Sequence, residues 1–136
     1  MRYIDANIFL RHLTRDDPKM AQACLDLFQK AKHKEVALTT TESVIAEVVF
    51  VLSSKQLPYN LSRMDIRTRL YPLLSLPGLR LPKRRVYLRA LDLYASYTID
   101  FEDALLIAHM ERQKSKEIYS YDREFDQIPS LKRLEP

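Results

Sequence analysis

The chain has 136 residues, enough for one domain with a single hydrophobic core, and we expect residues 1–136 to form that one domain. Hydrophobic residues make up 46% of the chain and charged residues 29%, and no apolar run is long enough for a membrane-spanning helix. The formal net charge of +4 favours a polyanionic partner, although the chain also contains 18 acids. A single cysteine, Cys24, excludes a disulfide framework and predicts a reducing, cytoplasmic setting.

Short apolar segments alternate with longer amphipathic segments along the chain. Asp17 followed by Pro18 is typical of a helix N-cap and the first helical position. A later helix is expected to begin after Asn60 or Ser62, and Pro72 should bend or end it. In chain order, the expected elements are a strand at 2–5, helices at 6–13 and 18–32, a strand at 35–39, a helix at 40–55, a break at Leu57–Pro58, a helix from 60 or 62 to 76, a turn at 77–78, a strand at 79–82, helices at 84–97 and 101–114, a strand at 117–122 and an edge strand at 131–134.

This alternation predicts an α/β fold with a central parallel sheet of four to five short strands, covered by helices on both faces. Gly78 is the only glycine, which excludes phosphate-binding and dinucleotide-binding loops and the glycine-flanked serine of many hydrolases. None of the three histidines has the spacing of a paired zinc ligand; they are His12, His33 and His109. The candidate chemistry therefore lies in the carboxylates.

Four acids follow apolar segments or lie within them, where a carboxylate is costly to place. Asp5 and Asp122 end predicted strands, and Asp103 lies at the start of a helix. Glu47 lies in a helix otherwise lined by aliphatic residues, with no basic residue three or four positions away along its polar stripe. Carboxylates that converge repel one another unless a cation neutralises them, so the sequence favours a Mg²⁺ or Mn²⁺ site that acts on a phosphodiester.

Each acid also has a structural interpretation. Asp5 and Asp122 could cap the turns that follow them, and Asp103 could form a capping box with Asp100. Glu47 is expected to be buried and then needs a partner, which is either a distant arginine or lysine or a metal ion. We favour the metal ion for Glu47.

Four short motifs in this order resemble those of the PIN-domain ribonucleases, in particular the VapC-like toxins of prokaryotic toxin–antitoxin pairs. IDANIFL is similar to the family's D-x-N strand end, SVIAE to its helix with a serine four residues before the glutamate, FEDALLIA to its D-A-hydrophobic helix start, and YSYDREF to its T/S-x-D-x-x-F segment. The resemblance covers the whole chain and implies a PIN-like three-layer α/β/α domain. Ser120 stands where threonine is usual, and Glu124 where the family often has another acid, so either Asp122 alone or Asp122 with Glu124 completes the expected site.

The resemblance implies a Mg²⁺- or Mn²⁺-dependent endoribonuclease that cleaves RNA with a metal-activated water and leaves a 5′-phosphate. Asp5, Glu47 and Asp103 would bind the metal directly or through water. Asp122 would hold a second metal or orient the attacking water. The residues expected to orient these carboxylates are Asn7, Ser43, Ser120 and Glu124. A homodimer and a cognate antitoxin protein are also implied.

Basic residues that could contact the RNA backbone are densest before and within one predicted helix, at Lys83, Arg84, Arg85 and Arg89. Taken singly, each is also explained as part of a solvated helix face. Two other functions remain open. One is a non-catalytic nucleic-acid-binding or regulatory module, in which the acids are caps and ion pairs. The other is a metal-dependent nuclease acting on DNA, or a phosphatase, on a similar scaffold.

Overall fold

Six α-helices and two short pairs of parallel strands make up the chain in a computed structural model, which describes residues 1–56 and 58–136. The elements are β1 (Arg2–Tyr3), α1 (Ala6–Thr14), α2 (Pro18–Lys32), β2 (Leu38–Thr39), α3 (Glu42–Ser53), α4 (Arg63–Leu74), α5 (Arg84–Ser96), α6 (Phe101–Arg112), β3 (Glu117–Tyr119), the 3₁₀ helix η1 (Arg123–Gln127) and β4 (Lys132–Leu134). The predicted α/β class is confirmed. Among the described residues, no helix is long and apolar enough to cross a membrane.

Five of the described α-helices begin where a side chain accepts a backbone N–H, and α5 begins without such a cap. Asp17 caps α2, and Ser62 rather than Asn60 caps α4. Pro72 lies in the last turn of α4 without interrupting it, because α4 ends only at Leu74. The break predicted at Leu57–Pro58 lies partly outside the described residues, since Leu57 is not among them.

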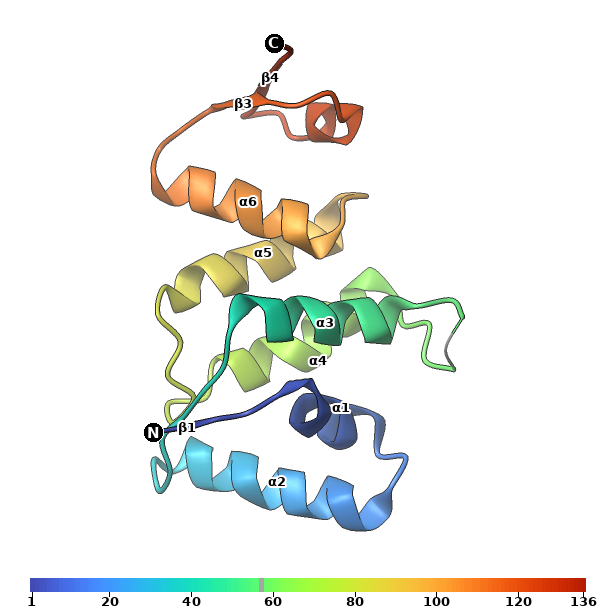
Figure 1. Ribbon diagram of the computed structural model, residues 1–136, viewed down its shortest axis with the longest axis vertical. Coiled ribbons are helices and arrows are strands. Elements are labelled where there is room, and N and C mark those ends of the chain that lie inside the picture. The colour runs from blue at the N-terminus through green and yellow to red at the C-terminus, as the bar shows by residue number, and fades with distance from the viewer. Residues whose placement is uncertain (57) are drawn as a thin grey trace.

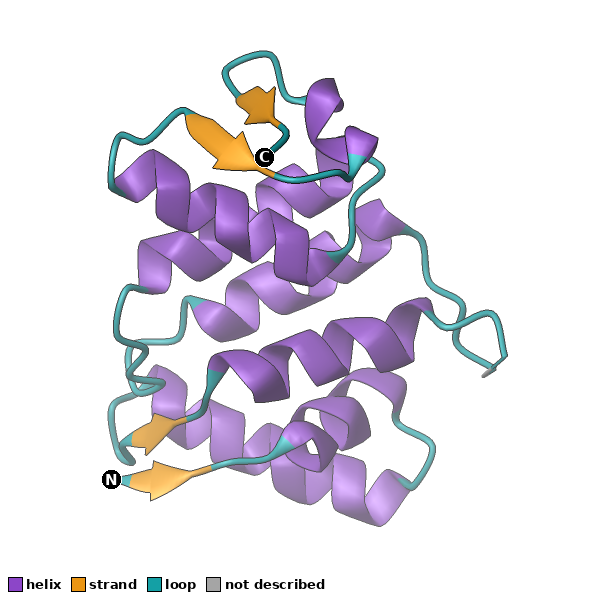
Figure 2. Ribbon diagram, turned by 45° about the horizontal axis from the view of Figure 1, so that its top comes forward, coloured by secondary structure: helices purple, strands orange, loops and turns teal. Residues whose placement is uncertain are grey.

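The strands form two separate pairs, and the single sheet of four to five strands expected from the sequence is not present in the described residues. β1 pairs in parallel with β2, and β3 pairs in parallel with β4. The predicted strand at 79–82 is reduced to one bridge, between Leu38 and Leu79. Figures 1 and 2 show helices α3, α5 and α6 between the β1–β2 pair and the β3–β4 pair. Strands of two or three residues carry too few hydrogen bonds to dictate the arrangement, so the packing of the helices decides it.

The hydrophobic core runs from α1 to η1 and holds the helices in place. Cys24 is a buried free thiol. The largest fully buried side chains are Phe9, Leu38, Ile45, Leu52, Ile66, Leu70, Leu74, Leu79, Leu91, Leu93, Ile99 and Ile107. Burial of side chains of this size stabilises the fold by roughly 1.5–3 kcal/mol each relative to exposure.

Gly78 lets the segment after α4 approach the end of α2 closely. Its N–H donates to the carbonyl of Ala31 at 2.8 Å, and its own carbonyl accepts the N–H of Leu38 at 2.7 Å. A Cβ at this position would lie 2.6 Å from the carbonyl oxygen of Val36, closer than real Cβ contacts come. The glycine is therefore required by the close approach of two backbones.

Candidate metal centre

Asp103 lies in the first turn of α6, where the helix N-terminus is fixed by Asp100. The Oδ1 of Asp100 accepts the N–H of Asp103 at 2.8 Å, so Asp100 is the N-cap. The capping interpretation is thus correct for Asp100, and Asp103 takes part through its backbone. Ala104 and Ile107 are buried in the core and fix the orientation of the helix beneath the Asp103 carboxylate.

Asp122 follows β3 and caps η1. One of its oxygens accepts the N–H of Glu124 at 2.9 Å, and the hydroxyl of Ser120 accepts the N–H of Asp122 at 3.0 Å. Phe125 is buried and anchors η1 against the core. The N-cap interpretation of Asp122 is therefore correct. Ser120, predicted to orient a carboxylate, bonds to the backbone N–H of Asp122 and so fixes the turn that carries it.

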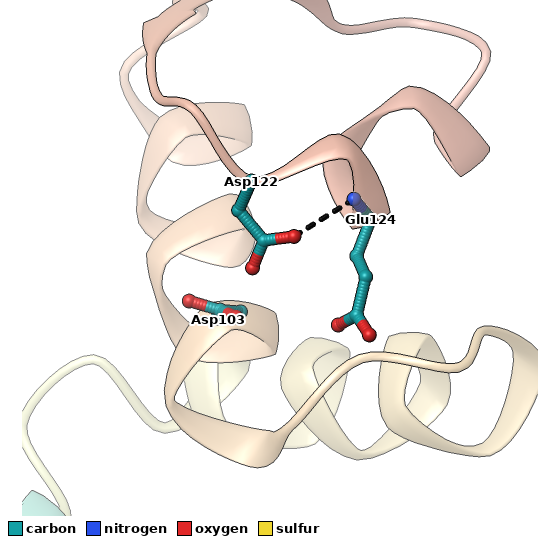
Figure 3. Close-up of side chains that lie close together, drawn as sticks. All are labelled: Asp103, Asp122 and Glu124. Carbon is teal, nitrogen blue, oxygen red and sulfur yellow. Dashed lines mark hydrogen bonds between the residues drawn. The ribbon is translucent and has the colours of Figure 1, made fainter.

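Three carboxylates meet between α6 and η1. Asp103, Asp122 and Glu124 each present an oxygen that lies within 4.8 Å of the other two, and we call these residues the carboxylate cluster. Figure 3 shows Asp122, the N-cap of η1, and Glu124, in η1, on the side of the segment that faces Asp103. No salt bridge from residues 1–56 or 58–136 neutralises any of the three.

The carboxylate cluster fits a small divalent cation by spacing and by chemistry. Mg²⁺ binds oxygen ligands at about 2.1 Å, so two ligands on opposite sides of the ion are about 4 Å apart. The limit of 4.8 Å within the cluster is close to this span. Mg²⁺ also keeps several waters and needs only one or two protein carboxylates directly.

The charge of Asp103 is destabilised in the absence of a cation. Partial burial is the main cause that raises the pKa of Asp103 to about 6, and the negative charges of Asp100, Asp122 and Glu124 raise it further. A bound cation would favour the ionised form and reverse this shift. The raised pKa of Asp103 and the clustered carboxylate oxygens therefore indicate the same candidate site.

Asp5 lies apart from the carboxylate cluster. It caps α1, because its Oδ1 accepts the N–H groups of Asn7 at 3.0 Å and Ile8 at 3.4 Å. Both Asp5 and Asn7 are exposed, and Asp5 is not a member of the group of three. The physical reason is that β1 and β3, which should bring their carboxyl ends together, are not paired. The roles assigned to Asp5 and Asn7 therefore stay predictions.

Glu47 is exposed, and the expectation that it is buried is wrong. Helix α3 turns Ile45 and Val48 into the core and leaves its opposite side open to solvent. On that open side Glu47 lines a groove between α3 and α6, together with Ser43 and Glu102. An exposed glutamate needs no partner, and Glu47 forms no salt bridge with the described residues. Its metal-binding role, and the supporting role of Ser43, remain predictions.

The basic residues expected to bind RNA differ in their exposure and in whether they already bond to other groups of the chain. Lys83 and Arg85 are exposed. Arg84 donates to two backbone carbonyls in the segment between α4 and α5. Arg89 forms two hydrogen bonds with Glu111, at 2.8 and 3.0 Å. Glu111 lies near the opposite end of α6 from the carboxylate cluster, so this basic group is about two helical turns away from the acids.

Arg63 is a residue whose structural role the sequence did not indicate. Its guanidinium donates to the carbonyls of Tyr94, Tyr97 and Ile99, at 3.1, 3.0 and 2.5 Å. It thereby fixes the segment between α5 and α6, directly before the cap of α6. These partners lie more than thirty positions away along the chain, so no local spacing could have revealed them.

The chain matches a known protein family. The family model for the PIN domain matches residues 2–131. The match begins at β1 and ends just before β4, so it includes all six helices and every acid discussed above. No curated protein matches the chain.

Proposed function

The chain belongs to the PIN-domain family, a family of metal-dependent nucleases, and on that premise we propose that it is a divalent-metal-dependent endoribonuclease. The observation that carries the proposal is the carboxylate cluster, in which three acids from two elements converge without a basic partner among the described residues. Carboxylates that converge repel one another, and a bound Mg²⁺ or Mn²⁺ ion would offset that repulsion.

The carboxylate cluster would hold the ion, and Asp5 and Glu47 are proposed as further ligands. When bound, the ion supplies a water that is more acidic than bulk water, together with charge that offsets the scissile phosphate. The pKa of Asp103, about 6, means that most of its carboxyl is ionised at pH 7 and ready to bind the cation. Asp122 uses one oxygen as a cap, which holds the carboxylate in a fixed orientation.

The surroundings of the cluster suit a single-stranded nucleic acid, and we propose RNA because of the motif resemblance. Tyr121, directly before Asp122, is 71% exposed and offers a face on which an unpaired base can stack. Lys83 and Arg85 are exposed and are proposed to contact the phosphate backbone at a distance from the cut. The net charge of +4 supports attraction of a polyanion.

The biological setting is proposed from the resemblance of the four motifs to those of VapC-like toxins. In that setting the protein is the cytoplasmic toxin of a toxin–antitoxin pair, it forms a homodimer, and a small antitoxin protein is its partner. The segments that carry the four motifs lie at the end of β1, on α3, at the start of α6 and after β3. A neighbouring gene for a small antitoxin would support this proposal, and an isolated gene would count against it.

A comparison of substrates tests the enzymatic proposal. Purified protein is incubated with single-stranded RNA, single-stranded DNA and a small phosphate monoester, with Mn²⁺ or with a chelator. We expect cleavage of RNA only, dependent on Mn²⁺ and lost in Asp122→Asn. Preferential cleavage of DNA or of the monoester would replace the ribonuclease proposal with the alternative nuclease or phosphatase. Binding of RNA without cleavage would favour a non-catalytic module.

A further inference from the structure

Two of the three residues of the carboxylate cluster lie in the last part of the chain. Asp122 and Glu124 belong to residues 116–136, which contain β3, η1 and β4 and which we call the C-terminal unit. Among the described residues, β3 pairs only with β4. Figures 1 and 2 show the C-terminal unit beyond α6, at one end of the molecule. Asp103 lies on α6 itself, so the geometry of the cluster depends on how the C-terminal unit is held against the helices.

Arg133 holds the C-terminal unit together from within. Its guanidinium donates to the carbonyl of Ser120 after β3 at 3.0 Å, to Oδ1 of Asp126 in η1 at 3.0 Å and to Oε1 of Glu135 after β4 at 2.9 Å. All three acceptors belong to the same unit. These bonds fix the internal structure of the unit, and they do not fix its position relative to α6.

Two kinds of contact hold the C-terminal unit against the helices. Phe125 and Ile128 are buried and belong to the common hydrophobic core. Apolar packing is non-directional, so it holds the unit close without fixing its exact rotation. Of the hydrogen bonds that the described residues form, only those between Gln127 and Thr98 join the unit to the rest of the chain. No ion pair of the described residues joins them.

The side-chain amide of Gln127 uses its acceptor and its donors together. Its Oε1 accepts the N–H of Thr98 at 3.0 Å, and its Nε2 donates to the carbonyl of Thr98 at 3.2 Å. Nε2 also donates to the carbonyl of Glu124 at 3.1 Å, within η1. Hydrogen bonds weaken steeply when their angles change, so two bonds to one residue define an orientation as well as a distance.

The backbone segment that receives these bonds is fixed from another side as well. Arg63 of α4 donates to the carbonyls of Tyr97 and Ile99, the two neighbours of Thr98 in the chain, at 3.0 and 2.5 Å. Ile99 is buried, and the next residue, Asp100, is the N-cap of α6. The contact at Thr98 therefore lies on a held segment that leads directly into α6.

We propose that Gln127 is a positioning residue that fixes the spacing between Asp103, on α6, and the carboxylates of Asp122 and Glu124, in the C-terminal unit. The oxygens of the three acids lie within 4.8 Å of one another. Mg²⁺ requires near-ideal octahedral geometry, and the ligands of such a site have to be held to about 0.5 Å. Gln127 acts through the backbone and is not itself a ligand. The proposal rests on the proposed function, because it presupposes the metal site at the carboxylate cluster.

The variant Gln127→Met tests this role, since it keeps the length of the side chain and removes the amide. The Kd for Mn²⁺, read from the EPR signal of the free ion well below the unfolding temperature, should rise by about tenfold or more, as for other residues that orient metal ligands. Urea unfolding without metal should change little, because Gln127 is exposed. The control Gln113→Met makes the same change at the exposed C-cap of α6 and should leave the Kd unchanged.

A purely structural glutamine would give a different result. In that case Gln127→Met would lower the stability of the metal-free protein and leave the Kd for Mn²⁺ as in wild type, which would overturn the proposal. An equal rise of the Kd in Gln113→Met would also overturn it, because the effect would then not depend on the contact with Thr98.

Amide hydrogen exchange of Thr98 tests the contact itself in protein without metal. Thr98 is exposed, and its N–H is bonded to Oε1 of Gln127. Exchange of this amide should be slow in wild type and in Gln113→Met and clearly faster in Gln127→Met. Equal exchange rates in wild type and Gln127→Met would show that the contact does not form in solution and would overturn the proposal.

The same measurements separate this proposal from the proposed function. If wild-type protein binds no Mn²⁺, the metal site and the positioning role fail together. If wild type and Gln127→Met bind Mn²⁺ equally, only the positioning role fails. If the Kd rises in Gln127→Met as expected and wild type cuts no RNA, the positioning role stands and the proposed ribonuclease fails.

Discussion

Asp103 is the acid whose ionised form the folded protein destabilises most. Its pKa is raised to about 6, first by burial and then by neighbouring acids, so the folded state binds a proton more tightly than the unfolded state does. The stability that this proton contributes is fully present below pH 4 and is lost as the pH rises through about 6. Metal-free protein is therefore expected to lose stability across this interval.

The variant Asp103→Asn removes the unfavourable charge. In urea unfolding without metal, it should be more stable than wild type at pH 8, and the difference should fall away below pH 4. The control Asp26→Asn changes an exposed acid in α2, outside the carboxylate cluster, and should not show this pH dependence. A variant that is less stable than wild type at pH 8, by the roughly 1 kcal/mol of a lost cap, would show that the Asp103 carboxylate is structural.

Glu47 can be tested separately because its exposure removes the alternative of a buried ion pair. Glu47→Gln should leave urea unfolding within about 0.5 kcal/mol of wild type, as expected for a surface substitution. If Glu47 is a metal ligand, RNA cleavage should fall by orders of magnitude. Glu102→Gln, from the same groove, serves as the matched control and should retain cleavage. Normal cleavage in Glu47→Gln would remove this residue from the site.

Local residue chemistry could be predicted from the sequence where it depends on a few neighbours. The caps formed by Asp5, Asp17 and Asp122 follow from an acid placed before a helical segment. The exposure of Glu47 could not be predicted in this way, because an apolar helix is buried only as far as other elements cover it. The position of Glu124 in the carboxylate cluster depends on the geometry of η1, and this geometry could not be predicted from the sequence.

At the scale of elements, helices were easier to predict than strands. Helix α2 begins at Pro18 and ends at Lys32 as expected, and the other five helices lie within their predicted segments or differ at the ends. A helix satisfies its own hydrogen bonds, so its limits are encoded locally. The segment 79–82 forms only a bridge because strand formation depends on a partner elsewhere in the chain.

The basic face of α5 gives a prediction about binding. Arg85→Ala/Arg89→Ala should weaken binding of single-stranded RNA across sequences, and its salt dependence should flatten by about one unit of slope per lost phosphate contact. Cleavage at saturating RNA should change much less. Arg84→Ala is not a matched control because Arg84 bonds to the backbone, so Lys30→Ala, which changes an exposed lysine on α2, is compared instead and should leave binding unchanged. Unchanged affinity and salt slope in the double variant would place RNA elsewhere.

The contact between α2 and the segment after α4 gives a prediction about stability. Gly78→Ala would place a methyl group 2.6 Å from the carbonyl oxygen of Val36, and one of the two backbones would have to move. Both hydrogen bonds of Gly78 would be strained, and we expect a loss of roughly 2 kcal/mol or more in urea unfolding. Ser75→Ala, at the C-cap of α4, provides the comparison with a smaller loss. An unchanged free energy of unfolding in Gly78→Ala would show that the two backbones do not approach each other this closely.

At the scale of the whole molecule, the class of fold could be predicted and the arrangement of the strands could not. Alternating strand and helix segments correctly indicate an α/β protein. Which short strands pair depends on the packing of α3, α5 and α6, which a single sequence does not reveal. The site was predicted as four acids meeting together, whereas one chain brings together Asp103, Asp122 and Glu124.

The central claim is that the carboxylate cluster binds a divalent cation, and a thermal-unfolding titration with Mn²⁺ tests it most directly. Binding to the folded state alone stabilises it by about 2.7 kcal/mol at a free concentration one hundred times the Kd. Wild-type protein should therefore show a Tm that rises with Mn²⁺, and Asp103→Asn/Asp122→Asn should show no rise. A wild-type Tm that does not change with Mn²⁺, or a rise of equal size in the double variant, would contradict the claim.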